Sequence, residues 1–110
     1  MSKYFVNIKP LSVNDAWQGK RFKTKAYKDY EQQVYYSLPN NLIIPEGKLE
    51  IYYTFYFTTS NSDLDNPVKM FQDILCKKYK FNDNAIFKII IEKVVSKKIG
   101  IEFQILNYNK

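Results

Sequence analysis

Histidine is absent from this 110-residue sequence, and cysteine occurs only once. Without an imidazole ring the chain has no Ser-His-Asp or Cys-His nucleophilic site, no histidine general base and no histidine-containing zinc site. The single Cys76 excludes an internal disulfide and a four-thiolate metal site, which indicates a reducing compartment. Any catalysis must therefore use carboxylates, lysine, hydroxyl groups and a hard metal ion.

Long apolar runs are also missing. No stretch approaches the roughly 18 uninterrupted apolar residues that a membrane span needs, and residues 1–10 lack the apolar core of a signal peptide. Hydrophobic residues nevertheless make up 45% of the chain and aromatic residues 17%, which indicates a folded protein. We expect one domain over residues 1–110, a cytoplasmic location and no membrane partner.

Positive charge is concentrated at one end of the sequence. The net charge is +6, and residues 1–28 hold seven cations against one acid, whereas the rest of the chain holds ten of each sign. Trp17, Phe22 and Tyr27 are interleaved with these cations. This combination is typical of a surface that binds a phosphate backbone and stacks on bases. The alternative is a solvated basic loop that keeps a small protein soluble.

Hydrophobic periodicity predicts an α+β domain with the element order β-α-β-α-β-β and a mixed sheet of about four strands, on which two main helices pack. The expected elements are a strand over 3–8, a loop over 9–23, a helix from the cap Thr24 to Leu38, a strand over 48–58, a helix from Asn66 to about Tyr79, a turn over 81–84, and strands over 86–95 and 99–106. The residues expected to bury the helices are Tyr27, Tyr30, Val34 and Leu38 in the first, and Val68, Phe71, Ile74 and Leu75 in the second.

Acidic residues flank the second predicted helix. Asp63 and Asp65 follow the long strand two positions apart, so an extended backbone would project both side chains to the same side. Asp83 lies in the turn after the helix and meets them if the helix doubles the chain back. Lys69 lies one helical turn beyond Asp65 and off the apolar stripe.

These four residues suit metal-assisted phosphate chemistry. Three adjacent carboxylates repel one another at neutral pH, which raises the pKa of at least one, and a divalent cation with one ammonium group balances their charge. Oxygen ligands select hard ions, so Mg²⁺ is the expected metal, Mn²⁺ its alternative, and zinc is not expected. Such a cation promotes phosphodiester hydrolysis without imidazole.

A purely structural interpretation of the same residues stays open. Asp65 and Asn66 would then cap a helix. Lys69 would pair with Asp73 at i,i+4, and Asp83 would make an Asx turn. The function would in that case be a non-catalytic basic nucleic-acid-binding module, or a small interaction protein whose aromatic surface meets a protein partner.

The run DLDNPVK over 63–69, followed by NDNAI over 82–86, resembles the RusA family of Holliday-junction resolvases. The opening segment KPLSVN over 9–14, with Trp17, is also similar to that family, so the resemblance spans most of the chain. It implies a Mg²⁺-dependent, homodimeric endonuclease that nicks two strands of a four-way DNA junction symmetrically in recombination and repair. Such enzymes are often encoded by phages and prophages.

Site residues follow from this resemblance position by position. It implies that Asp63, Asp65 and Asp83 are metal ligands and that Lys69 is the catalytic lysine. The chain departs from the family at Asn82, where an acidic residue is common, and the lower negative charge bears on metal affinity. The basic residues Lys20, Arg21, Lys23, Lys25 and Lys28 would then line a groove for phosphates. Contacts of this kind give affinity and little reading of base sequence. Asn14 and Trp17 are further candidate DNA-binding residues; the alternative for Asn14 is an Asx turn, and for Trp17 it is a side chain that pins its loop onto the core.

Overall fold

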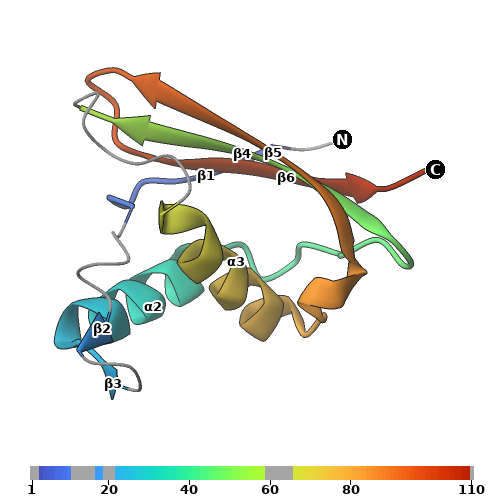
Figure 1. Cartoon of the computed structure of the whole chain (residues 1–110), viewed down its shortest axis with the longest axis horizontal. Helices are drawn as coiled ribbons and strands as arrows, with labels where there is room; N and C mark the ends of the chain where they lie inside the picture. The colour runs from blue at the N-terminus through green and yellow to red at the C-terminus, as the bar shows by residue number, and fades with distance from the viewer. Residues whose placement is uncertain (1–2, 11–16, 19–21, 59–65, 110) are drawn as a thin grey trace.

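Strand β4 (Leu49–Phe57) shows the period-two alternation that its sequence predicts. Its odd-numbered side chains are buried and its even-numbered ones are partly exposed, because successive residues of a strand point to opposite faces. The computed structural model describes residues 3–10, 17–18, 22–58 and 66–109. In this part of the chain, helices cover one face of a four-stranded sheet and leave the other face open (Figure 1).

The sheet is mixed, in the strand order β1-β6-β4-β5. The other strands are β1 (Tyr4–Val6), β5 (Ile86–Val95) and β6 (Gly100–Asn107). Strand β6 pairs antiparallel with both β1 and β4, whereas β4 and β5 are parallel. A parallel pair needs a long crossover connection, and helix α3 (Asn66–Tyr79) lies in it. The predicted α+β class, element order and mixed sheet are confirmed.

Both helices begin and end close to the predicted positions. Helix α2 (Lys25–Ser37) is capped by Thr24, whose side-chain oxygen accepts a hydrogen bond from the Tyr27 amide at 3.1 Å. The predicted turn over 81–84 overlaps a single 3₁₀ turn, η1 (Asp83–Ala85). No described helix is long and apolar enough to cross a membrane.

One difference from the sequence prediction lies in the expected loop over 9–23. Two short strands, β2 (Trp17–Gln18) and β3 (Phe22–Lys23), pair antiparallel there. Strands of two residues carry no alternation that a sequence pattern could display, because period two needs at least four residues to be recognised.

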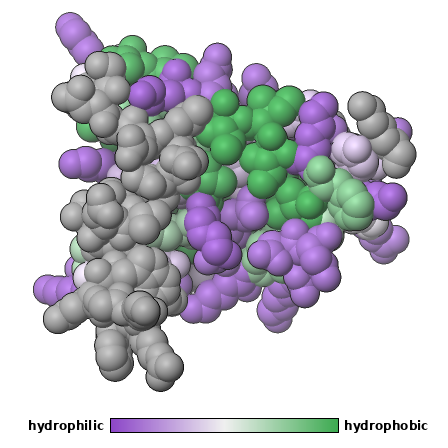
Figure 2. Space-filling model, viewed as in Figure 1, coloured by the Kyte–Doolittle hydropathy of each residue, from purple (hydrophilic) through white to green (hydrophobic). Residues whose placement is uncertain are grey.

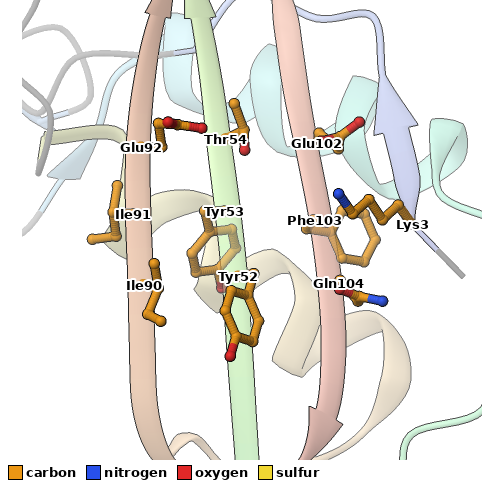
Figure 3. A pocket seen from close by; sticks show the side chains of 10 residues that line it. All are labelled: Lys3, Tyr52, Tyr53, Thr54, Ile90, Ile91, Glu92, Glu102, Phe103 and Gln104. Atoms are coloured by element: carbon orange, nitrogen blue, oxygen red, sulfur yellow. The ribbon is translucent and has the colours of Figure 1, made fainter. Parts of the chain in front are cut away.

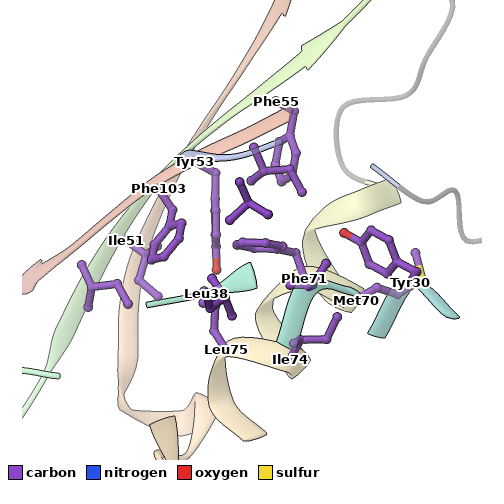
Figure 4. Close-up of a cluster of buried hydrophobic side chains, with 14 of the residues drawn as sticks. Tyr30, Leu38, Ile51, Tyr53, Phe55, Met70, Phe71, Ile74, Leu75 and Phe103 are labelled. Atoms are coloured by element: carbon purple, nitrogen blue, oxygen red, sulfur yellow. The ribbon is translucent and has the colours of Figure 1, made fainter. Parts of the chain in front are cut away.

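Aromatic side chains join α3 to the sheet (Figure 4). Phe71 packs edge-on against Tyr53 and Phe103, with ring centroids 6.0 and 5.6 Å apart. The hydroxyl group of buried Tyr53 donates to Gln72 at 3.1 Å. The apolar stripes predicted for the two helices are buried, except for Val68, which is only partly buried.

The C-terminal ends of α2 and α3 are tied together by hydrogen bonds. The Lys78 ammonium group donates to the backbone oxygens of Tyr35 and, at 2.9 Å, Leu38. The Tyr79 hydroxyl group donates to the Pro39 oxygen at 2.6 Å. These side chains satisfy carbonyl groups that the end of α2 leaves without helical partners. The two helices therefore keep a fixed relation to each other under the sheet.

Candidate functional site

Lys69 lies on the exposed side of α3, near its start. Its side chain is 69% exposed, and its ammonium group donates to Asp73 Oδ1 at 3.1 Å, one helical turn later. This hydrogen bond and the charge of Asp73 raise the pKa of Lys69, and the charge of Asp83 adds to the effect. Lys69 is therefore protonated at neutral pH.

Asp83 comes near the Lys69 ammonium group because the chain reverses after α3. Lys80 adopts a left-handed conformation with φ 56°, and the Phe81 amide donates back to the Cys76 oxygen at 3.2 Å, which closes the helix end. Asp83 then opens η1 with an exposed side chain. The turn η1 contacts α3, and the charge of Asp83 raises the pKa of both Lys69 and Cys76.

Cys76 continues the same side of α3, one turn beyond Asp73. It is half-buried, and burial, followed by the charges of Asp83 and Asp73, raises its pKa to about 11, while Lys69 acts in the opposite direction. The side chain is therefore a neutral thiol at physiological pH. We call Lys69, Asp73, Cys76 and Asp83 the α3 cluster.

The α3 cluster brings together two of the four residues predicted for catalysis, Lys69 and Asp83. The other two, Asp63 and Asp65, lie outside the described residues. Among those that the structure describes, no group of three or more histidine, cysteine or acidic side chains could hold a metal ion. The described carboxylates are oxygen donors, and the neutral thiol adds no soft thiolate, so this part of the site suits a hard cation.

Asp73 also belongs to the α3 cluster. The sequence assigned it only a structural role, as the partner of Lys69 in an ion pair within the helix. Its spacing from Lys69 is the signal that predicts an i,i+4 pair, and the pair is present. The spacing alone carries no information about Asp83, which joins them only through the reversal after α3. A pair that looks like helix stabilisation in the sequence is therefore part of a larger charged group.

The described part of the predicted DNA surface lies at the start of α2. Lys25 and Lys28 are exposed there. Between them Tyr27 is buried, and its pKa is raised to about 12 by burial and by the charges of Asp73 and Glu31. The start of α2 therefore lies beside the part of α3 that carries Asp73.

The remaining predicted DNA-binding residues are described less fully. Trp17 and Lys23 face each other in the register of β2 and β3, and only their backbone is described. Asn14, Lys20 and Arg21 lie outside the described residues.

The sequence also matches a known protein family. A family model for endodeoxyribonuclease RusA matches residues 9–106, which is nearly the whole chain. The matched segment contains the α3 cluster, both predicted aspartates that precede it and the basic residues at the start of α2. No curated protein matches the chain.

Proposed function

The chain belongs to the RusA family of endodeoxyribonucleases, which resolve Holliday junctions, and on that premise we propose that it is a metal-dependent, structure-selective nuclease. Its substrate would be a four-way DNA junction, cut by paired symmetric nicks during recombination and repair. The observation that carries this proposal is the α3 cluster, in which a protonated lysine lies near a carboxylate that the family match also covers.

Asp63, Asp65 and Asp83 would hold the divalent cation, with Mg²⁺ favoured and Mn²⁺ as the alternative. When bound, the cation would lower the pKa of a water molecule and stabilise negative charge on the phosphoryl group. Asn82 occupies the position that is commonly acidic in the family, and its side chain accepts a hydrogen bond from the Asn84 amide at 3.0 Å. The neutral residue thus caps the turn that presents Asp83.

Lys69 would act as a cation. Its raised pKa keeps the ammonium form, which attracts a phosphoryl oxygen and cannot accept a proton from water. Asp73 would be a positioning residue that orients the ammonium group through their 3.1 Å hydrogen bond. Because Lys69 is largely exposed, a DNA backbone can approach it from solvent.

Branched DNA would also contact the basic residues near the start of α2. Lys25 and Lys28 are exposed beside the part of α3 that carries Asp73, so phosphate contacts there would continue toward the α3 cluster. The other residues proposed for this surface are Asn14, Trp17, Lys20, Arg21 and Lys23. A homodimer would present two such sites, one for each nick.

The deciding experiment is a nicking assay on a synthetic four-way junction, with Mg²⁺, with Mn²⁺ and with EDTA. We expect nicking with either metal and none with EDTA. Asp65→Asn and Asp83→Asn should abolish nicking while junction binding persists. Asp29→Asn, which changes an exposed acid of α2, is the matched control and should nick normally.

Two outcomes would contradict parts of this proposal. Undiminished cleavage by Asp83→Asn would remove that residue from the ligand set. Junction binding with a steep salt dependence, but without cleavage in any divalent ion, would favour a non-catalytic DNA-binding module.

A further inference from the structure

Strand β5 has no buried side chain, although it is the longest strand of the sheet. Its exposed fractions include 54% for Phe87, 38% for Ile89, 41% for Ile90 and 50% for Val95. Figure 2 shows hydrophobic side chains gathered over the diagonal that β5 follows in the same view. Apolar residues are thus exposed on both faces of this strand, where a sheet normally buries at least one.

β5 is also an edge of the sheet. It pairs with β4 on one side, and no described strand pairs with its other side. The opposite edge, β1, has only three residues, whereas β5 has ten. A long apolar edge presents backbone N–H and C=O groups to any strand that can add to it. This makes β5 the strongest candidate for an interaction surface in the described part of the chain.

Two copies of β5 can pair antiparallel about a two-fold axis perpendicular to the sheet. That symmetry places residues of the same face opposite each other, so the axis must pass beside a residue that faces its own copy. A one-residue slip would put side chains of opposite faces against each other. Only a few registers along β5 therefore need to be compared.

Charge selects one of these registers. Lys88 and Glu92 lie on the open face with Ile90 between them, since they align with Glu50, Thr54 and Tyr52 of β4. Centring the pair on Ile90 places each Lys88 opposite the Glu92 of the second copy, twice by symmetry. If the pair is centred on Lys88 or on Glu92, that residue faces its own copy, so like charges are opposed. If it is centred on Ile89 or Ile91, neither Lys88 nor Glu92 faces a residue of opposite charge.

The neighbouring residues fit this register. Figure 3 shows Ile90 and Glu92 on β5 beside Tyr52 and Thr54, along a hollow of about 550 Å³ on the open face. The Lys88 ammonium nitrogen lies 3.9 Å from a carboxylate oxygen of Glu50 in its own chain. In the pair, the Glu92 carboxylate of the second copy would approach the same ammonium group.

We propose that two copies of this chain associate by antiparallel pairing of their β5 edges, centred on Ile90, to form one continuous sheet. This inference rests on the proposed homodimer and assigns its surface. Pairing covers the exposed edge from Lys88 to Glu92, and on the helix side it places Ile89 against Ile91 of the second copy. The register irregularity between β4 and β5 lies just before Lys88, so it leaves this segment regular.

Charge reversal tests the register in the absence of DNA. Glu92→Lys opposes lysine to lysine across the axis, and Lys88→Glu opposes glutamate to glutamate. Each single variant should weaken the dimer at least about tenfold, because two attractive pairs become repulsive. An equimolar mixture of the two variants should restore association, since both cross-strand pairs are then of opposite charge. Sedimentation velocity over a concentration series measures this, and thermal melts check that each variant is folded.

Cysteine cross-linking gives a second, independent readout. In a Cys76→Ser background, Ile90→Cys places two thiols directly opposite each other at a Cα separation of about 4.5–5.5 Å, which a disulfide can bridge. Ile89→Cys is the matched control, because that residue faces Ile91 of the second copy. Mild oxidation should therefore cross-link the first variant much faster than the second.

Several outcomes would overturn the assignment. A monomeric wild-type chain would reject any self-association. A dimer insensitive to both charge reversals, or one that cross-links equally through residues 89 and 90, would place the interface elsewhere. The last two results would leave the nuclease proposal intact, because junction nicking is measured separately and does not depend on which surface forms the dimer.

Discussion

The ammonium group of Lys69 is influenced by one carboxylate on its own helix, Asp73, and by another after that helix, Asp83. Because both raise its pKa, the protonated form persists to higher pH. Asp73→Asn replaces the charged acceptor with a neutral one and removes the larger charge effect, so the pKa of Lys69 should fall toward its ordinary value. The alkaline limb of the nicking rate should then move to lower pH, which a single-turnover pH profile measures.

A merely structural role for Asp73 predicts a different result. An exposed i,i+4 ion pair contributes only about 0.3–0.5 kcal/mol to folding, so the variant would nick with an unchanged pH profile and slightly lower stability. Lys69→Arg is a useful companion, because it keeps the positive charge to a much higher pH and should remove the alkaline limb.

Cys76 can report the geometry of the α3 cluster without any DNA. With a pKa of about 11, the wild-type thiol should be alkylated slowly at pH 8, at a rate rising about tenfold for each pH unit. Asp83→Asn should speed alkylation, since the charge of Asp83 raises this pKa, and Lys69→Met should slow it. Mass spectrometry of iodoacetamide time courses provides the rates. Equal alkylation rates in the wild-type protein and both variants would show that Asp83 does not lie close enough to α3 to influence Cys76.

At the scale of elements, Phe71 carries much of the contact between α3 and the sheet. Its side chain is fully buried between Tyr53 and Phe103. Phe71→Ala should therefore lower the free energy of unfolding by about 3–5 kcal/mol, through lost burial and the cavity left behind. Urea denaturation measures this change. Tyr36→Ala is the control, because that side chain is 76% exposed and its removal should cost little.

Elements with a clear hydrophobic period could be predicted from the sequence. Tyr27, Tyr30 and Val34 recur at helical spacing, and the odd residues of β4 alternate over nine positions, so one buried face specifies each element. The two-residue strands β2 and β3 lack such a period. The approach of Asp83 to Lys69 depends on the reversal at Lys80, a non-glycine residue with positive φ that no periodicity indicates.

At the scale of the whole molecule, the excess positive charge sits in the N-terminal quarter of the sequence, part of which reaches the start of α2. If Lys25 and Lys28 each contact a phosphate, Lys25→Gln with Lys28→Gln should reduce the slope of log K against log salt by about 1.8. Lys97→Gln, in the turn between β5 and β6, is the control and should leave the slope unchanged. Fluorescence anisotropy with a labelled junction measures the salt dependence of binding for the wild-type protein, the double variant and the control.

The proposed β5 pairing would also fix the distance between two α3 clusters. Asp83 lies just before β5, and a strand of ten residues is roughly 33 Å long. Antiparallel pairing puts the two copies of Asp83 at opposite ends of the paired strands, about 30 Å or more apart. Because the two-fold axis is perpendicular to the sheet, both would lie on the same side of it, where a single junction could meet both.

The strand order has a consequence for synthesis of the protein. β6 is the last described strand to leave the ribosome, yet it lies between β1 and β4. Until it arrives, β1 has no sheet neighbour and one edge of β4 is unpaired, so a nascent chain can hold at most the parallel pair with α3. Folding of this sheet must therefore be completed after β6 has been translated, and chains halted before Gly100 should be substrates for chaperones and proteases.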